Sequence, residues 1–240
     1  MNEVTKCEIP TVADIVKLIE AGLYKTNAHD FISDILECGA IAVANSFNKT
    51  AKREETYFQI INKYDKEQQN LIVEIFSKIY ILLSNQINPD VGFNDYLGEI
   101  YMQSQISNNK TGQFFTPFHI SKLTAGVEMD TNTVKEYMEQ DRILKIFEPS
   151  CGSGGMILAC ADILYNKYGF NISRNLFVEC GDIDRRCVCM TYLQLSLAGI
   201  PAIVYHRDGL TLQTWDKWET PAYLMQYLRF KNCKKERLKC

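Results

Sequence analysis

The fold of this chain is decided at residues 147–155, which read Phe-Glu-Pro-Ser-Cys-Gly-Ser-Gly-Gly. The mostly apolar run Ile143–Phe147 leads into this stretch and predicts a short buried strand. Apolar residues then recur at three- and four-residue spacing from Met156 to Leu164, which predicts a helix. Open α/β sheets bind ligands at such strand–glycine–helix turns, because backbone amides and the positive end of the helix converge there.

The residues of this turn indicate which ligand it suits. A dinucleotide-binding fingerprint needs a third glycine where Ile157 stands, and a phosphate loop needs Gly-Lys-Ser/Thr, which the chain lacks here. Glu148 would repel a pyrophosphate and attract a cationic group. The turn therefore favours S-adenosylmethionine, which carries ammonium and sulfonium groups, over NAD or ATP. The alternative is a purely structural turn.

Composition places the chain among ordinary globular proteins: 240 residues, 46% hydrophobic and 23% charged. No run is long enough to span a membrane, and the amino terminus lacks the pattern of a signal peptide, so we expect a cytoplasmic protein with reduced cysteines. The nine cysteines form no Cys-x-x-Cys pair and the three histidines are dispersed, so we predict no metal site. Residues 229–240 carry six basic side chains and one acidic one, which predicts either contact with nucleic acid or a solvated helix end.

The first 105 residues show helical periodicity throughout. We expect helices to begin near Thr11 and Asp30, two more between residues 51 and 86, and another over Asp95–Gln103. The polar segment Ser107–Gly112 then marks a boundary and a loop. We therefore predict an all-α domain over residues 1–105, followed by an α/β domain over residues 106–240.

Three side chains of the second part stand where a ligand would meet them. Thr116 is expected to cap a helix beginning at Pro117. Asp182 follows an apolar strand over Leu176–Cys180, where an acid typically accepts hydrogen bonds from ribose hydroxyls. Asp208 follows a third strand and could accept a hydrogen bond from an exocyclic amine. Asp184 is expected to cap the next helix.

The combined order of these segments resembles adenine-specific DNA methyltransferases, and most of all the modification (M) subunits of type I restriction systems. The resemblance covers roughly residues 93–223 and rests on Asp95–Tyr101, Gly112–Pro117, Glu148–Gly155, Gly181–Asp184 and Arg207–Leu210.

The resemblance implies a Rossmann-like domain that binds S-adenosylmethionine. Phe115 and Thr116 would hold the methionine part, Asp182 the ribose and Asp208 the adenine. The glycine turn would pack against the cofactor through Glu148, Cys151, Gly152, Ser153 and Gly154. It also implies methyl transfer to the 6-amino group of an adenine flipped out of DNA, with DNA as substrate and a specificity subunit or a second copy as candidate partner.

The chain departs from the family at the catalytic motif. The family has Asn-Pro-Pro-Tyr/Phe, and the nearest counterpart here is Thr220-Pro221-Ala222-Tyr223. A threonine hydroxyl is a poorer acceptor than an asparagine side chain, and loss of one positioned acceptor typically costs about 3 kcal/mol in the barrier. The family's sheet has later strands that this sequence does not show, so we expect a truncated domain. With Thr220, Pro221 and Tyr223 as candidate catalytic residues, the alternatives are a relative that binds cofactor and DNA without turnover, and a methyltransferase acting on RNA or protein.

Overall fold

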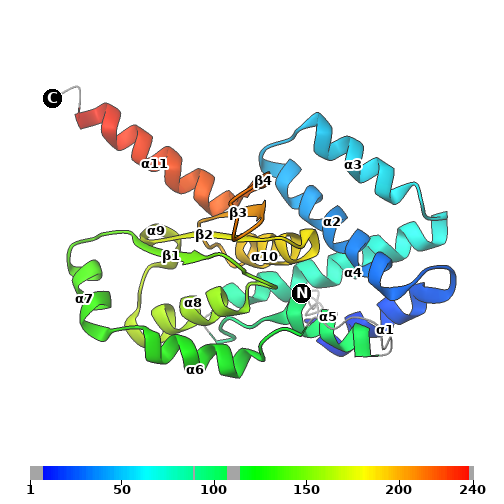
Figure 1. Ribbon diagram of the computed structural model, residues 1–240, viewed down its shortest axis with the longest axis horizontal. Helices are drawn as coiled ribbons and strands as arrows, with labels where there is room; N and C mark the ends of the chain where they lie inside the picture. Colours follow the sequence, from blue (N-terminus) through cyan, green and yellow to red (C-terminus); the bar gives the residue numbers. More distant parts are fainter. Residues whose placement is uncertain (1–7, 89, 107–113, 238–240) are drawn as a thin grey trace, which may run out of the picture.

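The computed structural model describes residues 8–88, 90–106 and 114–237, with the backbone alone for residues 25, 105, 106 and 230–237 (Figure 1). The helices before the sheet are α1 (Val12–Ala21), α2 (Ala28–Phe47), α3 (Ala51–Ile61), α4 (Lys66–Ser84), α5 (Tyr96–Ile106), α6 (Phe118–Glu128) and α7 (Thr131–Glu139), with short 3-10 turns at Gly22–Lys25 and Asn85–Ile87. The helices among and after the strands are α8 (Gly155–Tyr168), α9 (Ile172–Asn175), α10 (Arg185–Leu197) and α11 (Pro221–Arg237).

Side-chain caps fix where the amino-terminal helices begin. Thr11 accepts a hydrogen bond from the amide of Asp14, whose carboxylate binds back to the Thr11 amide in a capping box. Asn27, Thr50 and Asp65 cap α2, α3 and α4 in the same way through their side chains. The helices predicted from periodicity over the first 105 residues are therefore confirmed.

The sheet has four strands in the order β1 (Leu144–Glu148), β2 (Leu176–Asp182), β3 (Ala202–Arg207) and β4 (Thr214–Glu219). The first three are parallel, so their carboxyl ends lie at one edge of the sheet. β4 turns back and pairs antiparallel with β3, with Ile203 opposite Glu219 and Arg207 opposite Thr214. The end of β4 therefore lies at the edge where the parallel strands begin. The arrangement is a mixed α/β fold with a Rossmann-like parallel part.

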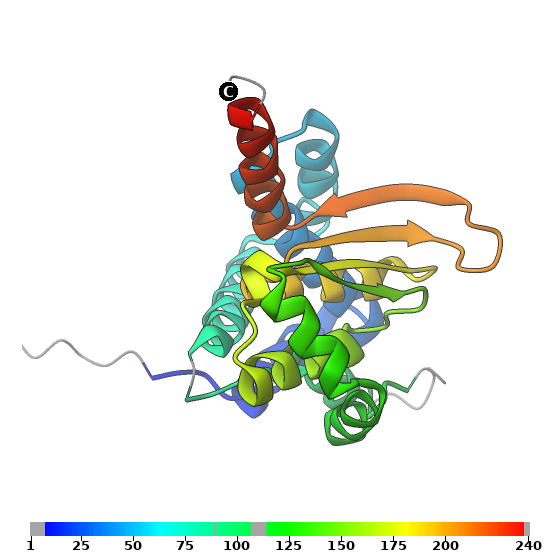
Figure 2. The same ribbon diagram turned by 90° about the vertical axis from the view of Figure 1, so that its left-hand side faces the viewer.

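The two faces of the sheet differ in cover. Leu176, Val178 and Cys180 point to the inner face and are fully buried, beneath α10. Figure 2 shows α6 and α8 on one side of the sheet, with α11 rising from the other side. Phe147, on the outer face of β1, is 60% exposed. The sequence predicted a buried strand here, and that prediction is wrong: Lys145 and Phe147 are exposed, and Leu144 and Ile146 on the other face are only half-buried.

The helical part and the sheet share one hydrophobic core. The same cluster of buried side chains includes Phe31 and Ile75 from α2 and α4, Leu193 from α10, and Val178 and Val204 from the sheet. Helix α10 lies between α2 and the strands, and it contacts both. Packing is thus continuous across the predicted division at residues 105 and 106, and this division stays a prediction. The predicted loop over Ser107–Gly112 lies outside the described residues.

Helix α11 ends the described chain and projects away from the sheet (Figure 1). Side chains from residue 230 onward lie outside the description, so nucleic-acid contact by this basic end stays a prediction. Among the residues described, we find no helix with the length and apolarity that crossing a membrane requires.

The two tryptophans offer a matched test of the core. Trp218 is fully buried, 5.1 Å from the ring of Tyr192 between ring centroids, whereas Trp215 is 45% exposed. We expect Trp218→Ala to lower the free energy of unfolding by about 3–5 kcal/mol, because it leaves a cavity in the shared core. Trp215→Ala should cost about 1 kcal/mol or less. Urea unfolding followed by circular dichroism measures both, and equal losses would contradict this packing.

Candidate functional site

The glycine turn between β1 and α8 needs glycine at two positions. Gly152 has φ +55° and Gly154 has φ +97°, a region that side chains disfavour. The Gly154 amide donates to the carbonyl of Cys151 at 2.8 Å and closes the turn. The Cys151 amide donates to the carbonyl of Gly181 at 2.9 Å, so the turn is fastened to the end of β2. The backbone thus has the tight strand-to-helix turn that the glycine spacing predicted.

A cavity of about 540 Å³ lies over this turn. Seven of the predicted cofactor residues line it together: Phe115, Thr116, Glu148, Cys151, Gly152, Ser153 and Asp182. They come from the segment before α6, from the β1–α8 turn and from the end of β2. The structure therefore brings together side chains that are up to 67 positions apart in the sequence.

Asp182 is held rigidly at the wall of the cavity. One carboxylate oxygen accepts the amide of Gly152 at 2.9 Å, and the other accepts the amide of Asp184 at 2.9 Å. The residue is only 6% exposed. Each carboxylate oxygen can accept a further hydrogen bond, so the fixed group can still receive two ligand hydroxyls.

Phe115 and Thr116 form the opposite wall. The ring of Phe115 packs close to Gly152, where an added Cβ would come within 3.3 Å of ring carbon Cδ1, and its centroid is 5.5 Å from that of Tyr101. The prediction that Thr116 caps the next helix is wrong: α6 begins at Phe118 after Pro117, with no side-chain cap. Thr116 is exposed and free of this role, and it faces the cavity.

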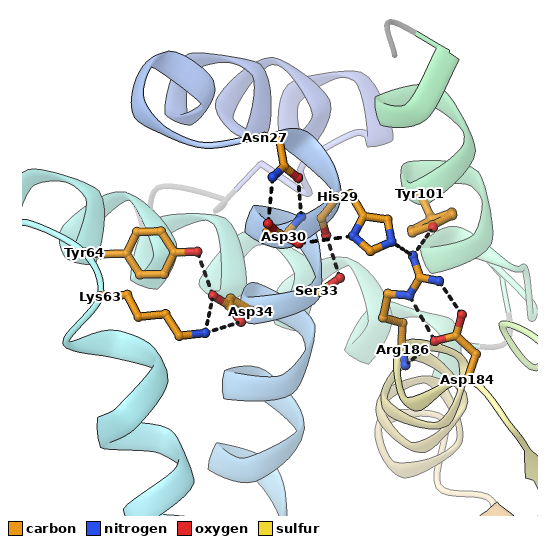
Figure 3. Close-up of polar contacts among 10 residues, drawn as sticks. All are labelled: Asn27, His29, Asp30, Ser33, Asp34, Lys63, Tyr64, Tyr101, Asp184 and Arg186. Atoms are coloured by element: carbon orange, nitrogen blue, oxygen red, sulfur yellow. Dashed lines mark hydrogen bonds and ion pairs between the residues drawn. The ribbon is translucent and has the colours of Figure 1, made fainter. Parts of the chain in front are cut away.

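Beside the cavity, Arg186 joins three helices and the end of β2 (Figure 3). Its guanidinium donates to both carboxylate oxygens of Asp184, to the Tyr101 hydroxyl at 2.7 Å, and contacts the ring nitrogen Nε2 of His29. Although burial opposes ionisation, hydrogen bonds from Arg186 hold the pKa of Asp184 below its ordinary value. Asp184 also caps α10 by accepting the Arg186 amide, as predicted. Arg186 thus links α2 and α5 to Asp184 at the border of the cavity.

The model of the family described as N-6 DNA Methylase matches residues 93–236. The chain belongs to the N-6 DNA methylase family. This match contains every segment that forms the cavity.

Other comparisons add less. A structure from Listeria monocytogenes, assigned to the class I S-adenosylmethionine-dependent methyltransferases, is similar over 76% of this chain and 55% of its own, with 13% identity and a TM-score of 0.38. A type I restriction-modification methyltransferase subunit from Streptococcus thermophilus is similar over 82% of this chain and 57% of its own, with 13% identity and a TM-score of 0.35. The chain thus spans little more than half of either protein. No curated protein matches it.

Asp208 lies outside the cavity of this N-6 DNA methylase. Its carboxylate accepts the amides of Leu210 at 2.8 Å and Thr211 at 3.2 Å, and these bonds lower its pKa. Asp208 thus closes the turn between β3 and β4. Gly209 beside it lies against the carbonyl of Pro149, so this turn approaches the glycine loop through its backbone. A contact of Asp208 with adenine stays a proposal.

Thr220, which stands where the family has its catalytic asparagine, does not line the cavity. Because β4 runs antiparallel, Thr220 lies at the opposite edge of the sheet from the glycine turn. Its hydroxyl donates to the carbonyl of Ile200 at 2.9 Å and accepts the amides of Ala202 at 2.9 Å and Tyr223 at 3.3 Å. The residue is fully buried. In this arrangement the Thr220 hydroxyl joins β3 to α11 and does not line the cavity, so a catalytic role for Thr220 stays a prediction.

The other two candidates of the motif share this position. Pro221 is buried at the first turn of α11, where a proline loses no helical hydrogen bond. The ring of Tyr223 packs on Phe177 of β2, with ring centroids 5.6 Å apart. Both side chains therefore serve the contact between α11 and the sheet in this arrangement.

Sequence reasoning missed the two residues of α10 that support the glycine turn. Thr191 and Gln194 of α10 donate to the carbonyls of Gly152 at 2.9 Å and Ser153 at 2.7 Å, and so hold the glycine turn from below. They stand one helical turn apart in a buried helix, and only their polarity among apolar neighbours sets them apart in the sequence.

Thr220 supplies a test of this assignment. Thr220→Val should lower the free energy of unfolding by about 1–3 kcal/mol, because it strands three buried backbone groups. Affinity for S-adenosylmethionine should stay unchanged in the folded protein. Thr124→Val, which removes an exposed hydroxyl bonded to Ile120, is the matched control and should cost under about 0.5 kcal/mol. Weaker cofactor binding with unchanged stability would restore Thr220 to the site.

Proposed function

We propose that the chain binds S-adenosylmethionine in the cavity over Gly152–Gly155 and serves methyl transfer to the 6-amino group of adenine in DNA. The observation that carries the proposal is the charge of this wall. Four acidic residues line the cavity, Asp95, Glu148, Asp182 and Asp184, and none of its described lining residues is basic, although the carboxylate of Asp184 is paired with Arg186 beside the cavity. A ligand with cationic groups fits such a wall, and a pyrophosphate does not.

The family match and the class of the Listeria neighbour support S-adenosylmethionine as the cofactor. Its ammonium group suits the neighbourhood of Glu148, its ribose hydroxyls suit the free lone pairs of Asp182, and the exposed face of Phe115 suits its apolar parts. When bound, the cofactor supplies an activated methyl group. The residues of this chain would orient that group and exclude water from it.

The proposed substrate and partner follow from the family and from the resemblance of the motifs. DNA as substrate is supported by the family description. A specificity subunit or a second copy as partner rests on the resemblance of the ordered motifs to those of type I modification subunits. A second candidate function is cofactor and DNA binding without turnover. It is favoured by one observation: Thr220 lies at the far edge of the sheet, so the cavity lacks the family's acceptor from this motif.

Calorimetry with S-adenosylmethionine tests the cofactor. We expect binding by the wild-type chain and a loss of about 1–3 kcal/mol in binding free energy for Asp182→Asn, because a charged acceptor is lost from the wall. Glu20→Gln, which neutralises an exposed carboxylate of α1 in the same way, is the control and should bind like the wild type. NAD and ATP should show no binding.

A transfer assay with methyl-labelled cofactor and mixed DNA separates the two functions. Label in adenine supports the enzyme, and cofactor binding without label in DNA supports the binding protein. Label in RNA or in protein would replace DNA as the substrate. A folded chain that binds no S-adenosylmethionine at millimolar concentration would contradict both functions.

A further inference from the structure

Asp95 places a buried carboxylate directly behind the glycine turn. It precedes α5 and caps it: its carbonyl accepts the Glu99 amide and its Oδ1 accepts the Gly98 amide, both at 3.0 Å. The same carboxylate accepts the hydroxyl of Ser153 at 2.5 Å and the amide nitrogen of Gln194 at 2.7 Å. Asp95 is 6% exposed. The Asp95 side chain thus caps α5 and also binds Ser153 of the glycine turn, 58 positions later in the chain.

Gln194 completes this contact from a third element. Its side-chain nitrogen donates to Asp95 and also to the carbonyl of Ser153 at 2.7 Å, and its side-chain oxygen accepts the amide of Leu97 at 3.3 Å. Gln194 is fully buried, so these bonds are shielded from water. The start of α5, the glycine turn and the last turn of α10 therefore meet at one set of hydrogen bonds.

Two glycines make the space that the carboxylate occupies. A Cβ added to Gly155, the first residue of α8, would come within 2.6 Å of Asp95 Oδ2. A Cβ added to Gly98 would come within 2.3 Å of the same oxygen. Both distances are shorter than carbon and oxygen atoms tolerate. The glycines at the start of α8 and in α5 thus leave the room that the Asp95 carboxylate needs.

A solvent-exposed aspartate could cap α5 without the free-energy cost of burying its charge. Here the hydrogen-bonding side chains Ser153 and Gln194 are neutral, and burial raises the pKa of Asp95 despite its hydrogen bonds. Among the described residues no cation pairs with Asp95, and burying an unpaired carboxylate costs stability that capping alone does not require. The arrangement is explained when the carboxylate has a second task at the loop.

We propose that Asp95 is a positioning residue of the cofactor cavity, which acts through Ser153 and Gln194 to hold the turn Gly152–Gly155 in its binding conformation. The inference rests on the proposed cofactor function, because a fixed turn matters only when a ligand uses it. Asp95 borders the cavity, and the group on which it acts is the loop.

Binding of S-adenosylmethionine to a set of variants tests the proposal. We expect Asp95→Ala to weaken binding at least about tenfold, and Asp95→Asn to weaken it less, because asparagine keeps an acceptor for Gly98 or Gln194. Ser153→Ala should weaken binding as well, and Asp95→Ala with Ser153→Ala should be no weaker than the poorer single variant, since both break the same contact. Asp130→Asn, an exposed cap of α7, is the matched control and should not change the affinity.

Hydrogen–deuterium exchange of the free chain gives a second reading without ligand. Peptides covering residues 150–158 should exchange faster in Asp95→Ala and in Ser153→Ala than in the wild type, and peptides of α7 should not change. A folded Asp95→Ala variant with wild-type affinity and wild-type exchange would overturn the proposal, as would additive losses in the double variant.

The two proposals fail in different ways. If the wild type binds the cofactor and the Asp95 and Ser153 variants bind equally well, the positioning role is wrong and the proposed function stands. If the wild type does not bind, the proposed function is wrong, and exchange over residues 150–158 alone decides whether Asp95 holds the turn. Should Asp95→Ala fail to fold, Asp95→Asn and Ser153→Ala carry the same comparison.

Discussion

The burial of α10 is the constraint on which the rest of the structure depends. Every residue from Cys187 to Ser196 of this helix is buried. A helix buried all round must be covered on every side, and here the sheet covers one side and α2 with its neighbours the other. The structure therefore has three layers, the sheet, α10 and the amino-terminal helices, and the amino-terminal helices share the core of the sheet.

The same helix explains why the glycine turn is so well fixed. Arg186 at its first turn binds Asp184 beside the cavity, Thr191 binds the carbonyl of Gly152, and Gln194 binds Ser153 and Asp95. These contacts follow one another along the helix. A turn whose backbone must approach a ligand closely cannot carry large side chains of its own, so neighbouring elements have to supply its support.

Much of this could be predicted from the sequence, because it depends on local signals. Periodicity located the amino-terminal helices, and the glycine spacing located the turn and its place between strand and helix. The ends of parallel strands necessarily share an edge, which is why Glu148 and Asp182 were expected together and line one cavity. A family resemblance added Phe115 and Thr116, which a local pattern alone does not bring to that cavity.

The structure differs from the sequence-based expectations at two places: the edge of the sheet where Thr220 lies, and the exposure of β1. The first depends on strand direction and the second on which helices cover the sheet. Whether β4 runs parallel or antiparallel to β3 is set by long-range packing, and this choice moves Thr220 from the ligand edge to the opposite edge. Nothing local shows that Phe147 lacks a covering helix, since its strand reads as apolar. Asp95 and Gln194 meet across 99 positions of sequence, and neither residue type announces such a contact.

The uncovered outer side of β1 has a consequence for how the protein behaves at high concentration. No described strand pairs with the free edge of β1, so the peptide groups of that edge are available to another chain. Lys145 is exposed on the same face as Phe147, and a charged side chain on an edge strand resists intermolecular pairing. Lys145 thus places a positive charge beside the exposed ring of Phe147 on an edge strand of the described sheet, and like charges on two such strands repel each other.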